Sequence, residues 1–87
     1  MSADQINELR DTFRVAMLGW DVPVSVTIED DAANVAFELW GTKFEGSFYL
    51  TPTGDEWKTS DDCPHYITNG ESAWQWIAMK LHDKLTA

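Results

Sequence analysis

The chain has 87 residues, hydrophobic residues make up 44% of it, and its fifteen acidic against six basic residues give a formal net charge of −9. This length suits a single domain over residues 1–87, and the apolar content supports a modest core and argues against intrinsic disorder. The negative charge disfavours direct binding of nucleic acid or of an anionic membrane surface. One cysteine excludes an internal disulfide, and the lack of a basic leader or a long apolar run predicts a cytoplasmic protein.

The N-terminal segment has the pattern of an amphipathic helix over residues 3–18. Ser2 and Gln5 have the spacing of a capping box, and Gly19 is a suitable residue to end the helix. The apolar residues that recur on one face at helical spacing are Ile6, Leu9, Phe13, Ala16, Met17 and Trp20.

Three segments with alternating polarity follow, over residues 22–29, 35–40 and 44–50. Polar turns over residues 30–34 and 41–43 separate them, so we predict an antiparallel meander. The side chains expected to face the core are Val22, Val24, Val26, Ile28, Val35, Phe37, Leu39, Phe44, Phe48 and Leu50.

The last third of the chain is predicted to add a short strand and a helix. Residues 56–59 form the candidate fourth strand, with Trp57 as its anchor, and residues 60–65 read as a loop. Thr68 and Glu71 have capping-box spacing and open a helix to about residue 85. Its predicted core stripe is Trp74, Ile77, Ala78, Leu81 and Leu85. The resulting order, α-β-β-β-(β)-α, predicts an α+β two-layer sandwich with both helices on one face of the sheet.

The negative charge is concentrated in the predicted sheet, because residues 19–62 carry ten acidic and two basic residues. Because side chains alternate between the two faces of a strand, we expect Glu29, Glu38 and Glu45 to point away from the helices. Trp40 and Tyr49 are expected on the same outer surface. Carboxylates interleaved with aromatic rings predict a surface that mimics a nucleic-acid backbone and binds a basic protein. The structural alternative is an ordinary solvated face whose charges keep the sheet soluble.

Trp76 and Met79 are predicted to form a second contact surface. On a helical wheel Trp76 lies about 160° from the predicted core stripe, with Met79 beside it. Because tryptophan is enriched at binding hot spots, we expect this pair to lie either in a homodimer interface or in the surface that binds the target.

The sequence lacks the common catalytic motifs, so we predict a non-enzymatic protein without a cofactor, a metal or catalytic residues. Two alternatives remain in the predicted loop. Cys63 and His65 could form an active thiol and its base. Together with Asp61 and Asp62, they could also bind a divalent metal.

Two families offer partial resemblances. The order α-β-β-β-α resembles the double-stranded-RNA-binding domain, whose last helix begins with basic residues, whereas this chain has Asn69, Gly70, Glu71 and Ser72 there. The segment from Trp40 through Gly54, Asp55, Glu56 and Trp57 is similar to part of the acidic frataxin family. That second resemblance implies a metal-handling accessory role.

The combined pattern predicts a small acidic protein that inhibits a basic nucleic-acid-handling protein, such as a nuclease. This is the design of phage-encoded inhibitors, among them anti-CRISPR proteins and DNA mimics. A toxin-immunity protein is the first alternative, since the same acidic surface would neutralise a toxic nuclease. A frataxin-like metal-handling protein is the second.

Overall fold

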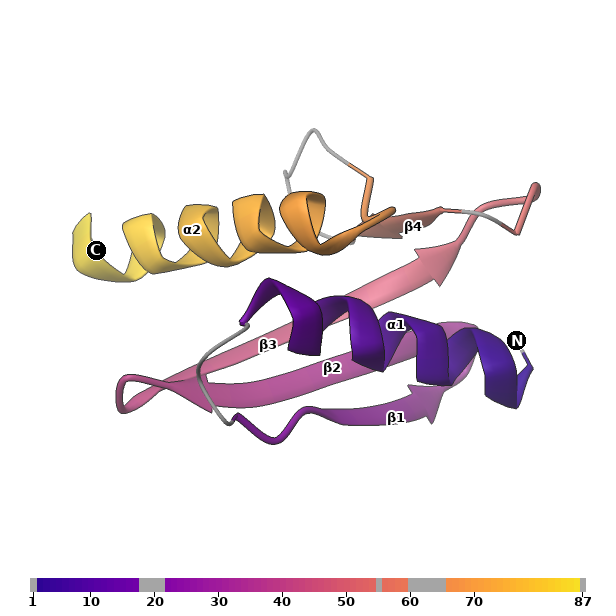
Figure 1. The fold of residues 1–87 in the computed structure, drawn as a ribbon, viewed down its shortest axis with the longest axis horizontal. Helices are drawn as coiled ribbons and strands as arrows, with labels where there is room; N and C mark the ends of the chain where they lie inside the picture. The colour runs from indigo at the N-terminus through magenta and orange to yellow at the C-terminus, as the bar shows by residue number, and fades with distance from the viewer. Residues whose placement is uncertain (1, 18–21, 55, 60–65, 87) are drawn as a thin grey trace.

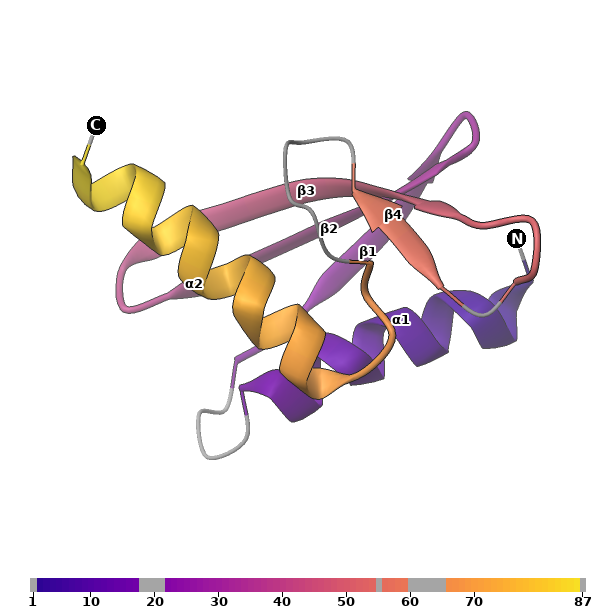
Figure 2. The ribbon, with the colours of Figure 1, turned by 90° about the horizontal axis from the view of Figure 1, so that it is seen from above.

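A computed structural model describes residues 2–17, 22–54, 56–59 and 66–86. The elements are, in chain order, helix α1 (Ala3–Ala16), strands β1 (Ser25–Glu29), β2 (Ala32–Leu39), β3 (Thr42–Leu50) and β4 (Trp57–Thr59), and helix α2 (Gly70–Thr86). The four strands form one antiparallel sheet in the order β1-β2-β3-β4, and both helices cover the same face of it (Figures 1 and 2). This arrangement confirms the predicted α+β two-layer sandwich. Neither of the two described helices is long and apolar enough to cross a membrane.

Helix α1 begins with the predicted capping box. The Ser2 hydroxyl accepts a hydrogen bond from the Gln5 amide at 3.2 Å, and the Gln5 side-chain oxygen accepts one from the Ser2 amide at 2.8 Å. These two bonds satisfy backbone donors that the first helical turn leaves open. The helix ends at Ala16 with Met17 as its C-cap. The predicted end at Gly19 and the predicted core residue Trp20 lie outside the described residues.

Tight turns set the register of the meander. Asp30 and Asp31 alone connect β1 to β2, so the predicted turn over residues 30–34 is too long. Strand β2 starts at Ala32, which pairs with Glu29, and Ala33 is fully buried. Strand β1 starts at Ser25, later than predicted. Ile28 was expected in the core, but it is 54% exposed because β1 is an edge strand.

Strand β4 is present as predicted, although it is short. Trp57 is buried and pairs with Leu50 of β3. On its other side Trp57 exchanges two backbone hydrogen bonds with Ile67, at 3.0 and 2.8 Å. Ile67 is also buried, and this bridge ties the chain just before α2 to the edge of the sheet.

The N-terminal cap of α2 lies one residue later than the predicted pair of Thr68 and Glu71. The Asn69 side-chain oxygen accepts a hydrogen bond from the Ser72 amide at 3.0 Å, and the Ser72 hydroxyl accepts one from the Asn69 amide at 3.0 Å. Asparagine is as good an N-cap as a hydroxyl residue, and Ser72 takes the reciprocal place that a carboxylate often fills.

The centre of the core is an aromatic cluster around Trp76, which is 0% exposed. Its ring lies 5.6 Å from that of Phe13, 5.3 Å from that of Phe48 and 6.5 Å from that of Phe37. The prediction that Trp76 is an outward contact residue is therefore wrong, and it does not lie in a dimer interface. Met79 was predicted beside it on the surface, but it is partly buried against the core.

Helix α2 is rotated in part from its predicted orientation, since Ile77 is buried as predicted and Leu81 packs against the core, but the rest of the predicted stripe is not fully buried. Trp74 is only partly buried, while Ala78 is exposed and Leu85 is 77% exposed. The residues on the inward side are Ala73, Trp76, Ile77, Lys80 and Lys84. The two lysines lie over aromatic rings, with Lys80 Nζ 5.7 Å from the Trp76 ring centre and Lys84 Nζ 5.8 Å from that of Phe44. At these distances the ammonium groups are within the range of a cation–π interaction with the rings.

Candidate functional site

The register places the predicted carboxylates on the outer face, which we define as the face of the sheet away from the helices. Glu38 of β2 lies opposite Lys43, and Glu45 of β3 lies opposite Ala36. Glu29, at the end of β1, has the same parity through its pairing with Ala32. All three glutamates are exposed. The outer face consists of Ser25, Thr27, Glu29, Asn34, Ala36, Glu38, Lys43, Glu45, Ser47, Tyr49 and Lys58.

Two lysines make this face mixed in charge. Lys43 is the cross-strand neighbour of Glu38, and Lys58 is the cross-strand neighbour of Tyr49. Directly opposed residues of unlike charge attract each other and reduce the field that either would project alone. Glu38 therefore contributes less to an acidic surface than its position in the sequence implied.

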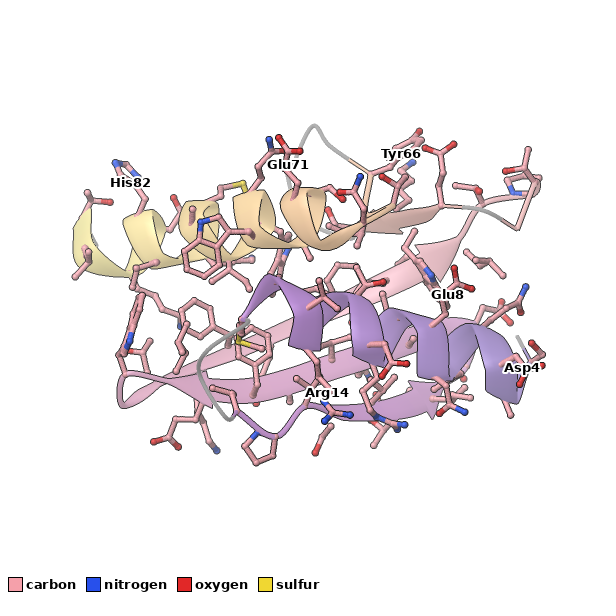
Figure 3. All side chains as sticks on the ribbon, in the orientation of Figure 1. Asp4, Glu8, Arg14, Tyr66, Glu71 and His82 are labelled. Atoms are coloured by element: carbon pink, nitrogen blue, oxygen red, sulfur yellow. The ribbon has the colours of Figure 1, made fainter. Side chains whose placement is uncertain are left out.

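Several carboxylates lie toward one end of the molecule, on α1, around the β1–β2 turn and at the start of β4. Asp4 and Glu8 lie along α1 toward the end where β1 finishes (Figure 3). The β1–β2 turn is at the same end, and a backbone hydrogen bond from Thr51 to the Glu56 carbonyl brings the start of β4 there. We call this group the acidic end: Asp4, Glu8, Glu29, Asp30, Asp31 and Glu56.

The opposite end carries three of the four lysines. Lys43, Lys80 and Lys84 surround a shallow hollow beside Phe44 and Glu45, near the β2–β3 turn and the C-terminal part of α2. The molecule measures 34 Å along its longest axis, several times the roughly 8 Å over which physiological salt screens charge. A partner can therefore meet the acidic end without being influenced by these three lysines.

A hollow of about 540 Å³ crosses the outer face between Glu29 and Glu45. Hydroxyl and amide groups line its floor, and the Ser47 hydroxyl donates a 2.5 Å hydrogen bond to the Asn34 side-chain oxygen. Lys80 reaches its rim from α2. No pattern in the sequence indicates this hollow, because the serine and threonine residues that line it carry no motif.

Trp40 lies at the tip of the β2–β3 hairpin and is 58% exposed. The prediction extended the second strand through Trp40, but the strand ends at Leu39, and Trp40 and Gly41 form a two-residue turn. Both have positive φ, 54° and 75°, as a type I′ turn requires. Asparagine or glycine is usual in the first position, since a bulky side chain is strained in the left-handed region.

We expect Trp40→Asn to stabilise the fold by about 1 kcal/mol, because asparagine tolerates this turn conformation better than tryptophan. The midpoint of thermal unfolding should rise by roughly 4–8 °C for a domain of this size. Trp40→Ala is the matched control, since it removes the indole but retains an unfavourable left-handed residue. Equal stability of the two variants would show that the turn conformation is not the cause.

The predicted loop residues Asp61, Asp62, Cys63 and His65 lie outside the described residues, so neither the thiol nor the metal alternative is tested. Within residues 2–17, 22–54, 56–59 and 66–86, no group of three or more histidine, cysteine, aspartate or glutamate side chains is arranged to hold a metal ion. The candidate site is built from the acidic end and the adjoining outer face, whereas Trp40 lies at the opposite end, in the β2–β3 turn.

Comparison of the chain with protein-family models, with curated protein sequences and with solved structures finds no match.

Proposed function

We propose that this protein is a non-enzymatic, cytoplasmic binding protein that inhibits a basic nucleic-acid-handling protein. The observation that carries the proposal is the acidic end, to which α1, the β1–β2 turn and the start of β4 each contribute carboxylates. These groups belong to a chain with a net charge of −9. A dense array of carboxylates on a rigid support resembles the phosphate array that such a partner binds.

Inhibition would follow from occupancy of the partner's nucleic-acid site. Electrostatic attraction gives fast association, and the affinity then falls as salt increases. The outer face adjoins the acidic end through Glu29, which belongs to both. The hollow between Glu29 and Glu45 supplies carboxylate and hydroxyl acceptors for a lysine or arginine side chain at the edge of the contact. Because Lys80 shares that hollow, the acidic end is the principal contact.

The test uses purified basic nucleases and nucleic-acid-binding proteins encoded near this gene or by its host. Each is titrated with the protein while cleavage or binding of a labelled duplex is measured. We expect inhibition by the wild type, with an affinity that weakens at least tenfold as salt is raised from low to physiological concentration. The proposal fails if none is inhibited, or if the inhibition does not depend on salt.

Matched substitutions locate the contact. We expect Glu29→Gln, Asp30→Asn and Asp31→Asn together to weaken inhibition by about tenfold, equivalent to ~1.4 kcal/mol. Asn suits the left-handed φ of 54° at position 30, so the turn is retained. The control, Glu38→Gln with Glu45→Gln, should lower affinity by only about two- to threefold, because Lys43 already compensates Glu38. The reverse ranking would place the interface on the sheet.

A further inference from the structure

The sheet has three strand edges without a partner strand among the described residues, and one of them, the outer edge of β4, is bridged at Trp57 by Ile67. Strand β1 pairs only with β2. Strand β3 pairs with β4 only from Phe48 onward, so its first part, residues 42–47, also has an open side. Open edges present unpaired backbone N–H and C=O groups, which form a template for another strand unless they are protected.

The open part of β3 is protected, whereas no comparable cover of the β1 edge is present in the part of the chain that the structure describes. Lys80 and Lys84 of α2 lie against the open part of β3, where they line a hollow with Phe44. Lysine over an edge is a common barrier to strand pairing. Strand β1 has the sequence Ser-Val-Thr-Ile-Glu, without lysine or proline, and its Ile28 is 54% exposed.

The hairpin register determines which backbone groups face the open side of β1. Glu29 and Ala32 close a two-residue turn, so they exchange both backbone hydrogen bonds, and the same pattern recurs at Thr27 and Ser25. The alternate residues, Val26 and Ile28, therefore direct their N–H and C=O groups outward. They are the donors and acceptors that an added strand would use.

We propose that β1 pairs antiparallel with β1 of a second copy of this chain, about a two-fold axis through Thr27. This register uses all five residues of the strand. It places Val26 opposite Ile28 of the second copy on the helix side, where the exposed isoleucine gains an apolar neighbour. On the outer face it sets Thr27 against its own equivalent, a favourable cross-strand pair.

The charges permit this pairing. In the antiparallel register Glu29 lies opposite Ser25 of the second copy. The two Glu29 residues are then four positions apart along the strands, roughly 14 Å, which exceeds the screening length of about 8 Å. Arg14 lies over the start of β1 (Figure 3). The acidic turn at Asp30 and Asp31 of the second copy would arrive at that same end, so unlike charges meet there.

The dimer would join two sheets into one of eight strands, and it brings the β1–β2 turn, which belongs to the inhibitory contact proposed above, beside the second copy. Its first test measures mass by sedimentation or light scattering, without any partner, over a concentration series. We expect a wild-type dimer that Ile28→Lys converts to a monomer. Leu85→Lys is the matched control, since it replaces another exposed apolar side chain, and it should remain dimeric. A wild type that is monomeric at every concentration overturns the proposal.

The second test examines the register in a Cys63→Ser background. Thr27→Cys places two thiols in a non-hydrogen-bonded pair with Cα atoms about 4.5 Å apart, within disulfide reach, so mild oxidation should give a covalent dimer. Ser25→Cys, on the same strand and face, places them roughly 14 Å apart and should remain uncrosslinked. Equal crosslinking of the two variants, or none in either, overturns the proposed register.

Discussion

Replacing Trp76 with alanine is expected to reduce the free energy of unfolding by about 3–5 kcal/mol, the range observed when a buried aromatic side chain is removed. The indole is fully buried and contacts the rings of Phe13 and Phe48, so its loss leaves a cavity that neighbouring rings cannot fill without moving. A domain of this length has a total stability on the order of 5–10 kcal/mol, so the variant should be close to unfolding.

Urea denaturation followed by far-ultraviolet circular dichroism measures this effect. Trp74→Ala is the matched control, because it makes the same change on the same helix at a partly buried position. We expect a loss of about 1–2 kcal/mol there. If the two variants lost equal stability, or if Trp74→Ala were the more damaging, the observed rotation of α2 would be wrong and the predicted one correct.

Gly46→Ala is expected to destabilise the protein by about 1–3 kcal/mol, since it overpacks the core at the same place. A Cβ atom added to Gly46 would lie 2.5 Å from Trp76 Cζ2 and 3.1 Å from Phe48 Cε2, so one of the rings must move. Trp76→Phe removes the clashing part of the indole. The double variant should therefore be more stable than the sum of the two single effects predicts, by at least about 0.5 kcal/mol.

Gly41→Ala provides the comparison for this cycle. Gly41 has a φ of 75°, and nothing lies within 4 Å of an added Cβ, so alanine there introduces backbone strain without a clash. Its effect should add to that of Trp76→Phe without coupling, because the two sites share no contact. If Gly41→Ala and Gly46→Ala showed coupling of similar size with Trp76→Phe, α2 would not be packed against the sheet at Gly46.

The sequence alone determined the elements and the parity of the strands. Helix α1 and its capping box follow from local hydrogen bonding between Ser2 and Gln5, which needs no tertiary contact. The alternation in β2 and β3 places Phe37 and Phe44 inside and Glu38 and Glu45 outside, because side chains in a strand point to opposite faces in turn. Local periodicity was sufficient for these features.

Only the tertiary structure decided the rotation of α2 and the place where charge accumulates. Hydropathy favours burial of the α2 face that carries Trp74 and Leu85, because the other face ends in two charged residues, Lys80 and Lys84. The inward face is the one with the lysines because Gly46 leaves room for one indole, and both ammonium groups lie over aromatic rings. A glycine inside a strand marks such a close approach, and it was the one signal in the sequence that could have indicated it.

The acidic end also depends on long-range contacts. Asp4, Asp30 and Glu56 are far apart in the chain. They lie at the same end of the sheet because the start of α1, the β1–β2 turn and the start of β4 are all located there. Counting the charged residues over residues 19–62 predicts that the whole sheet is acidic. Such a count ignores cross-strand neighbours, such as Lys43 opposite Glu38. Composition determined how much negative charge the protein carries, and the register and layer packing determined which of it remains uncompensated.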